Sequence, residues 1–134
     1  TIIGAHPNEE LQKEECENIH ITGFVENIED EILKNQIAVF PLTLGAGIKL
    51  KVLLAWGLGL PVITTDIGAE GIDEDGNTLI LANTDDQIKN EILELIDDSN
   101  KIKSKSIESK DFVKKYFSWN KTVELFDRLY EVRK

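Results

Sequence analysis

Apolar and polar positions along this chain follow two different periods. Continuous apolar runs predict buried strands over residues 37–42 and 61–65, since a strand covered on both faces has no polar side. A run rich in branched residues predicts a strand over 19–25, and shorter strands are expected over 1–5 and 78–81. Helical segments are expected between these strands. Strands that alternate with helices at short intervals predict an α/β fold built on a doubly wound parallel sheet.

Helical periodicity and capping residues mark the remaining segments. In the first half of the chain, helices are expected over 9–16, 27–34 and 47–56. Apolar residues recur at helical spacing from 88 to 96, after the N-cap cluster at 84–86. The polar stretch 97–110 fits either a loop or an exposed helix, and a last amphipathic segment extends from 112 to 130.

The glycine loop after the strand at 37–42 is the most informative segment. Gly45 and Gly47 let the backbone approach a phosphate without a Cβ in the way, and Lys49 and Lys51 follow in the first turns of the next helix. N–H groups at a helix N-terminus attract anions, and open parallel sheets bind ligands outside the carboxyl ends of their strands. The local pattern leaves two readings open, an anion site and a βα connection without a ligand.

Three more loops are expected at the same edge of the sheet. They span residues 4–8, 24–27 and 65–71, and the last contains a second glycine loop at 68–71. Most of these loops carry glycine or an N-cap residue. Together they predict one rim that receives a phosphate-bearing ligand.

Composition narrows the function classes. The chain has 134 residues, enough for one domain with a hydrophobic core, and a net charge of −10, which argues against non-specific binding to nucleic acid or anionic membranes. The single cysteine, Cys16, excludes an internal disulfide and fits a reducing compartment. No signal peptide, membrane-spanning run or metal-ligand cluster is evident in the sequence. Trp56 and Trp119 are interpreted as packing groups.

The first residue, Thr1, leads directly into a strand-like segment, and the sequence contains no methionine. We interpret the chain as a domain excerpt whose N-terminal part lies elsewhere. Its function is then expected to depend on that missing part.

The ordered set of motifs resembles the C-terminal domain of group 1 glycosyltransferases. The strongest pieces are residues 45–53, 59–65 and 68–72, and weaker ones are 2–5, 21–25, 117–119 and 129–130. The resemblance implies a retaining enzyme of the GT-B fold, with two Rossmann-like domains. It implies that residues 1–134 form the C-terminal domain, which holds the nucleotide of a sugar donor, and that an absent N-terminal domain holds the acceptor. The first strand and helix of the family's C-terminal domain are then missing here.

Carried over position by position, the resemblance implies a donor site. Its residues are Gly45, Ala46, Gly47, Ile48, Lys49, Leu54, Phe24, Val25, Thr65 and Glu70. The glycine loop would face the diphosphate and sugar, the strand end at 23–25 would lie near the base, and Thr65 with the 68–70 loop would line the rim. No metal or further cofactor is expected beside the nucleotide-diphosphate sugar.

One departure from the family pattern concerns two glutamates, whose positions are occupied here by Ala46 and Leu54. The second glutamate hydrogen-bonds the ribose hydroxyls in the family, which a leucine cannot do. Two hypotheses follow. The preferred one is a glycosyltransferase donor domain, inactive when isolated, that transfers a hexose to a glycan or lipid acceptor; the alternative is a degenerate, non-catalytic GT-B domain that acts as a structural or partner-binding module. A two-domain sugar-nucleotide epimerase is a weaker third option.

The resemblance also implies a cellular setting. Polysaccharide assembly on the cytoplasmic side, with peripheral membrane association of the full-length enzyme, is what the family leads us to expect.

Overall fold

The computed structural model describes residues 1–73 and 76–131. Unit 1 comprises residues 1–35 and unit 2 begins at residue 36; each is compact, and we describe each by itself. The reading of residues 1–134 as one domain stays a prediction.

Unit 1 contains two short helices that begin at the predicted asparagines. The side chain of Asn8 accepts a hydrogen bond from the first turn of α1 (Glu9–Lys13), and Asn27 does the same for α2 (Ile28–Leu33). These bonds satisfy backbone donors that a helix leaves unpaired at its start. The capping pattern therefore placed the starts of both helices, whereas α1 ends at Lys13, three residues before the predicted end at residue 16.

The strands predicted over 1–5 and 19–25 are wrong. Their pairing is reduced to an isolated parallel bridge between Ile2 and Ile21. Ile32 is the one buried side chain of unit 1, so little apolar surface is available to hold a longer ladder together. Two paired segments without a third strand or a covering helix are only marginally stable.

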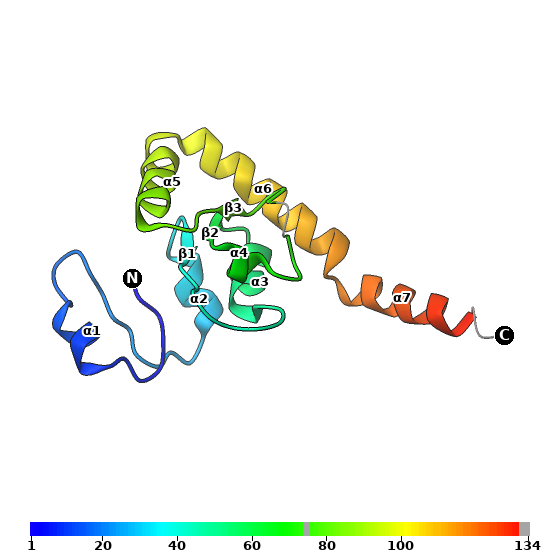
Figure 1. The fold of residues 1–134 in the computed structure, drawn as a ribbon, viewed down its shortest axis with the longest axis horizontal. Helices are drawn as coiled ribbons and strands as arrows, with labels where there is room; N and C mark the ends of the chain where they lie inside the picture. Colours follow the sequence, from blue (N-terminus) through cyan, green and yellow to red (C-terminus); the bar gives the residue numbers. More distant parts are fainter. Residues whose placement is uncertain (74–75, 132–134) are drawn as a thin grey trace. The chain divides into compact units, whose positions relative to one another are not determined.

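Unit 2 is a mixed α/β structure with a small parallel sheet. Its elements are β1 (Ala38–Phe40), α3 (Leu50–Gly57), β2 (Val62–Thr64), α4 (Asp66–Ala69), β3 (Ile80–Leu81), α5 (Asp85–Asp97), α6 (Ser99–Tyr116) and α7 (Trp119–Glu131). The strand order is β1-β2-β3, and both neighbouring pairs are parallel (Figure 1). Phe40 pairs with Thr64, and Thr64 pairs with Leu81, so the three strands end at the same edge of the sheet.

Two apolar contacts hold the helices of unit 2. Ile63 of β2 and Leu95 of α5 are fully buried in one cluster. Trp56 of α3 is also fully buried, and its ring centroid lies 4.8 Å from that of Phe112 on α6. The prediction that Trp56 is a packing group is confirmed, whereas Trp119 is 84% exposed and that prediction is wrong.

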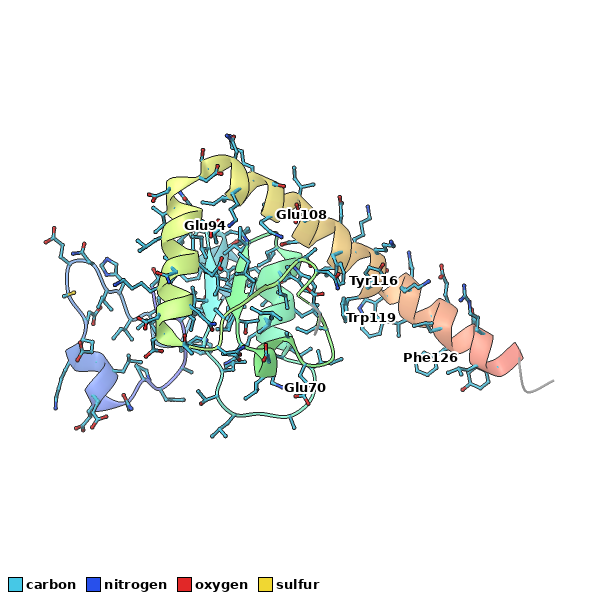
Figure 2. All side chains as sticks on the ribbon, turned by 45° about the horizontal axis from the view of Figure 1, so that its top comes forward. Glu70, Glu94, Glu108, Tyr116, Trp119 and Phe126 are labelled. Atoms are coloured by element: carbon cyan, nitrogen blue, oxygen red, sulfur yellow. The ribbon has the colours of Figure 1, made fainter. Side chains whose placement is uncertain are left out.

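The exposure of Trp119 follows from the helix that it begins. Along α7 the apolar residues form one stripe whose members are at least half exposed: Trp119, Val123, Phe126 and Tyr130. Figure 2 shows Trp119 and Phe126 along this helix. No other segment of the described residues covers this stripe.

The polar stretch 97–110 is mostly helical: Asp97 ends α5, Asp98 lies between the two helices, and residues 99–110 belong to α6. Asp98 caps this helix by accepting hydrogen bonds from the N–H groups of Asn100 and Lys101. Lys105 and Glu108 form an ion pair one turn apart on this helix, with 3.0 Å between the ammonium and the carboxylate. Figure 2 shows Glu108 on α6. Of the two structures predicted for this stretch, the helix is therefore the one that forms, and the cap and the ion pair stabilise it. The predicted cap of α5 is confirmed as well, since Thr84 forms a capping box with Gln87.

Candidate functional site

The site is built where the three strands of unit 2 end. The hydroxyl of Thr64 donates to the carbonyl of Phe40 at 2.9 Å, and the hydroxyl of Thr65 donates to the carbonyl of Leu42 at 2.6 Å. These bonds fasten the segment after β1 to the end of β2. They hold the residues that directly precede the glycine loop in place.

The segment after β2 is a helix where the sequence predicted a glycine loop. Thr65 caps α4, because its hydroxyl oxygen accepts the N–H of Gly68 at 3.2 Å. A Cβ at Gly68 would lie 1.9 Å from the hydroxyl oxygen of Thr64. The glycine thus serves close packing of α4 against β2, and the loop predicted over 68–71 is wrong for Gly68 and Ala69, which lie in α4. Thr65, predicted to line the rim, is nearly buried. Its hydroxyl is already hydrogen-bonded to the Leu42 carbonyl and to the N–H of Gly68.

The glycine loop between β1 and α3 is open and donor-rich. Gly45 (φ +134°) and Gly47 (φ +70°) have backbone conformations that side chains strain to adopt. Residues 44–48 are exposed, and α3 begins at Leu50, later than the predicted residue 47. Among the described residues, no hydrogen bond is donated by the backbone N–H groups of 45–48. Such donors near a helix N-terminus can bind an anion.

An ion pair links this loop to the end of α4. The ammonium of Lys49 lies 3.2 Å from Glu70 Oε2 and 2.5 Å from the carbonyl oxygen of Gly47. The side chain of Lys49 is 10% exposed and that of Glu70 is 53% exposed. Figure 2 shows Glu70 at the end of α4. The structure therefore brings together two of the predicted rim loops, 43–49 and 65–71.

The other predicted site residues lie on the glycine loop, on α3 and in unit 1. Ala46 and Ile48 belong to the exposed loop, and Leu54 is half-buried on α3. Phe24 and Val25 belong to unit 1, and Phe24 is 77% exposed. Their roles toward a donor stay predictions.

Asn83 is a residue at this edge that the sequence reading missed. Its side-chain oxygen accepts the N–H of Asp66 at 2.9 Å, which ties the end of β3 to the start of α4. Its position as the first polar residue after an apolar strand-like run was a usable signal, because strand ends of a parallel sheet lie together.

Asp73 is a second missed residue. It is nearly buried, and its carboxylate accepts the N–H groups of Leu79 and Thr78 at 2.8 Å each and that of Asn77 at 3.0 Å. Burial acts to raise the pKa of the Asp73 carboxyl, but these hydrogen bonds outweigh it and hold the pKa below the ordinary value of 3.8. The predicted turn signal at 75–77 lies partly outside the described residues; Gly76 within it has a φ of +63°.

The described residues contain neither a metal-ligand cluster nor a helix that could span a membrane. Residues 1–73 and 76–131 contain no group of three or more His, Cys, Asp or Glu side chains placed to hold a metal ion. Within the same ranges, no helix combines the length and the apolar character that crossing a membrane requires.

One family model matches most of the chain. The model of the family described as "Glycosyl transferases group 1" matches residues 1–98, which include the glycine loop, α4 and β3. No curated protein matches the chain. The family match covers well over half of the 134 residues, and on this evidence the chain belongs to the group 1 glycosyltransferases.

Proposed function

We propose that this chain is the donor-binding part of a retaining glycosyltransferase that uses a nucleotide-diphosphate sugar. Unit 2 then belongs to a doubly wound, Rossmann-like sheet that forms one half of a GT-B fold. An N-terminal domain of the same protein supplies the acceptor site, and a hexose passes to a glycan or lipid acceptor. The setting we propose is polysaccharide assembly in the cytoplasm.

The observation that carries this proposal is the set of unpaired donors in the glycine loop. The N–H groups of residues 45–48 lie on an exposed loop directly before α3 and have no acceptor among the described residues. A diphosphate offers several anionic oxygens to such a loop, and the dipole of α3 adds to the attraction. Donors fixed in advance also stabilise the charge that develops on the departing diphosphate. In this mechanism the loop holds the leaving group, and no residue forms a covalent intermediate.

The experiment is ligand-observed NMR on the chain with UDP, GDP and ADP, each compared with its monophosphate. We expect one diphosphate to bind more tightly than its monophosphate, and we expect Gly47→Val to abolish that binding. Gly47 has a φ of +70° and open space around its missing Cβ, so the substitution strains the loop without a clash elsewhere. Normal diphosphate binding by Gly47→Val, or no preference for any diphosphate, would overturn the proposal.

A matched control separates binding from folding. Gly76 also has a positive φ, +63°, but it lies outside the glycine loop and against Leu81. Gly76→Ala is expected to lower stability while the remaining folded protein binds the diphosphate as before. Equal loss of binding in both glycine variants would mean that Gly47→Val acts through folding.

Leu54 supports a second candidate, a degenerate domain kept as a structural or partner-binding module. It stands at the position that the family resemblance assigns to the ribose-binding glutamate, and its side chain is half-buried on α3. Under the transferase proposal, Leu54→Glu should tighten nucleoside diphosphate binding by roughly 10- to 150-fold, the value of one hydrogen bond to a charged group. No gain in Leu54→Glu, together with no turnover of nucleotide sugars by the full-length protein, would favour the module.

A further inference from the structure

Lys49 is nearly buried although it ends an exposed loop of unit 2. Its side chain is 10% exposed, whereas Leu44 is 86% and Ile48 is 52% exposed. A Cβ at Gly45 would lie 3.1 Å from Lys49 Cε, so the backbone of the loop passes closely over the lysine stem. The loop is folded around this side chain.

The ammonium group of Lys49 fixes one peptide plane of the loop. It donates to the carbonyl oxygen of Gly47 at 2.5 Å. In a trans peptide the carbonyl and the following N–H point in opposite directions, and the described residues contain no cis peptide bond. The N–H of Ile48 is therefore turned away from Lys49, on the opposite side of the peptide plane. Rotation of this peptide would turn that donor inward.

Glu70 holds the lysine in this position. Its carboxylate pairs with the Lys49 ammonium at 3.2 Å across two loops, and it also balances the lysine's charge. The pair carries no net charge, so the attraction of the loop for an anion comes mainly from its N–H groups. The two loops approach each other beside this pair as well, since a Cβ added at Gly71 would lie 3.4 Å from Ile48 Cγ1.

We infer that Lys49 and Glu70 form a latch that orders the glycine loop for a diphosphate. Lys49 is a positioning residue, which acts on the ligand through the Gly47 carbonyl and the loop N–H groups, and Glu70 positions Lys49. The inference rests on the proposed function for its ligand. Its structural half, the ordering of the loop, is independent of any ligand.

Two readouts test the latch in the 134-residue chain. The first is the amide NMR signals of Gly47 and Ile48 without ligand, and the second is the affinity for UDP, GDP and ADP. The variants are Lys49→Met, Glu70→Ala and Glu70→Gln. Lys51→Met is the control, because Lys51 lies exposed in the first turn of α3 and takes no part in the ion pairs of the described residues.

We expect Lys49→Met and Glu70→Ala to shift or broaden both amide signals and to weaken diphosphate binding about tenfold, as for the loss of one charge-assisted hydrogen bond. Glu70→Gln should restore part of both, since its amide oxygen still accepts from Lys49. Lys51→Met should leave the two amide signals in place.

The opposite sign would overturn the inference. If Lys49 bound the diphosphate directly and Glu70 competed for it, Glu70→Ala would tighten binding, because removal of a carboxylate also removes repulsion of the anion. Unchanged amide signals in Glu70→Ala would likewise exclude the latch. If no diphosphate binds the wild-type chain, the proposed function fails, and the amide signals alone still decide whether the latch exists.

Discussion

Two loops of unit 2 use the same backbone chemistry in opposite ways. The glycine loop presents the N–H groups of residues 45–48 without an acceptor among the described residues. In the Asp73 turn, by which we mean Asp73 with residues 76–79, the carboxylate of Asp73 accepts the N–H groups of Asn77, Thr78 and Leu79. One loop carries its own anion, and the other has donors ready for an external one.

The difference shows what decides whether a donor-rich loop is a binding site. Buried N–H groups need acceptors, and a nearby aspartate is a strong one. No carboxylate lies within the glycine loop itself, and Glu70, which reaches the end of the loop, is paired with Lys49. An internal acceptor therefore marks the Asp73 turn as structural, and its absence marks the glycine loop as the candidate site.

The largest expected effect on stability comes from removing the carboxylate of the Asp73 turn. Asp73→Ala leaves the N–H groups of three residues without their acceptor, and we expect the free energy of unfolding to fall by about 3 kcal/mol. Chemical denaturation measures this loss. Asp111→Ala, which removes an exposed carboxylate on α6, should change stability by less than about 0.5 kcal/mol. Equal effects of the two substitutions would contradict the role assigned to Asp73.

A smaller effect is expected beneath the glycine loop. Thr65→Val keeps the shape of the side chain but removes the bond to the Leu42 carbonyl and the cap of α4, and we expect a loss of about 1–2 kcal/mol. Thr84→Val removes only the cap of α5 and should cost about 1 kcal/mol. Denaturation midpoints compare the two. A smaller loss for Thr65→Val than for Thr84→Val would mean that the tie to Leu42 contributes nothing.

The smallest effect is a change with pH. The pKa of Asp73 is below 3.8 in the folded chain, so the folded state binds this proton more weakly than the unfolded state does. Its contribution to stability is complete above the unfolded-state pKa near 3.8 and is lost as the pH falls through the lower folded-state pKa. The stability difference between the wild type and Asp73→Asn should therefore narrow below about pH 4. A difference that stays constant down to pH 2.5 would contradict the lowered pKa.

The sequence was most informative where one local pattern decides the structure. Continuous apolar runs placed β1 and β2, and N-cap residues placed the starts of α1, α2 and α5, because capping depends on a few neighbouring residues. Trp119 was misread because helical spacing shows that a face is apolar but not that anything covers it. The strand at 1–5 failed for a related reason, since pairing depends on partners distant in sequence.

In the candidate site, too, local features could be predicted from the sequence and long-range contacts could not. The glycines and Lys49 were visible in one short segment, so the loop could be located. The partnership of Lys49 with Glu70 spans a strand and two helices, and no local pattern reveals it. The role of Gly68 was hidden as well, because its value lies in contact with a threonine on β2 rather than in a turn.

One of the two tryptophans is buried and the other is exposed, so their intrinsic fluorescence reports separately on the interior and on the surface of unit 2. Trp56 is fully buried beside Phe112, whereas Trp119 is 84% exposed at the start of α7. Indole emission moves to longer wavelength when the ring meets water, so the blue part of the fluorescence spectrum belongs to the packing of α3 on α6. With Trp119→Phe, the remaining signal follows the interior of unit 2 alone, and whatever comes to cover α7 can be read from the wild-type spectrum by difference.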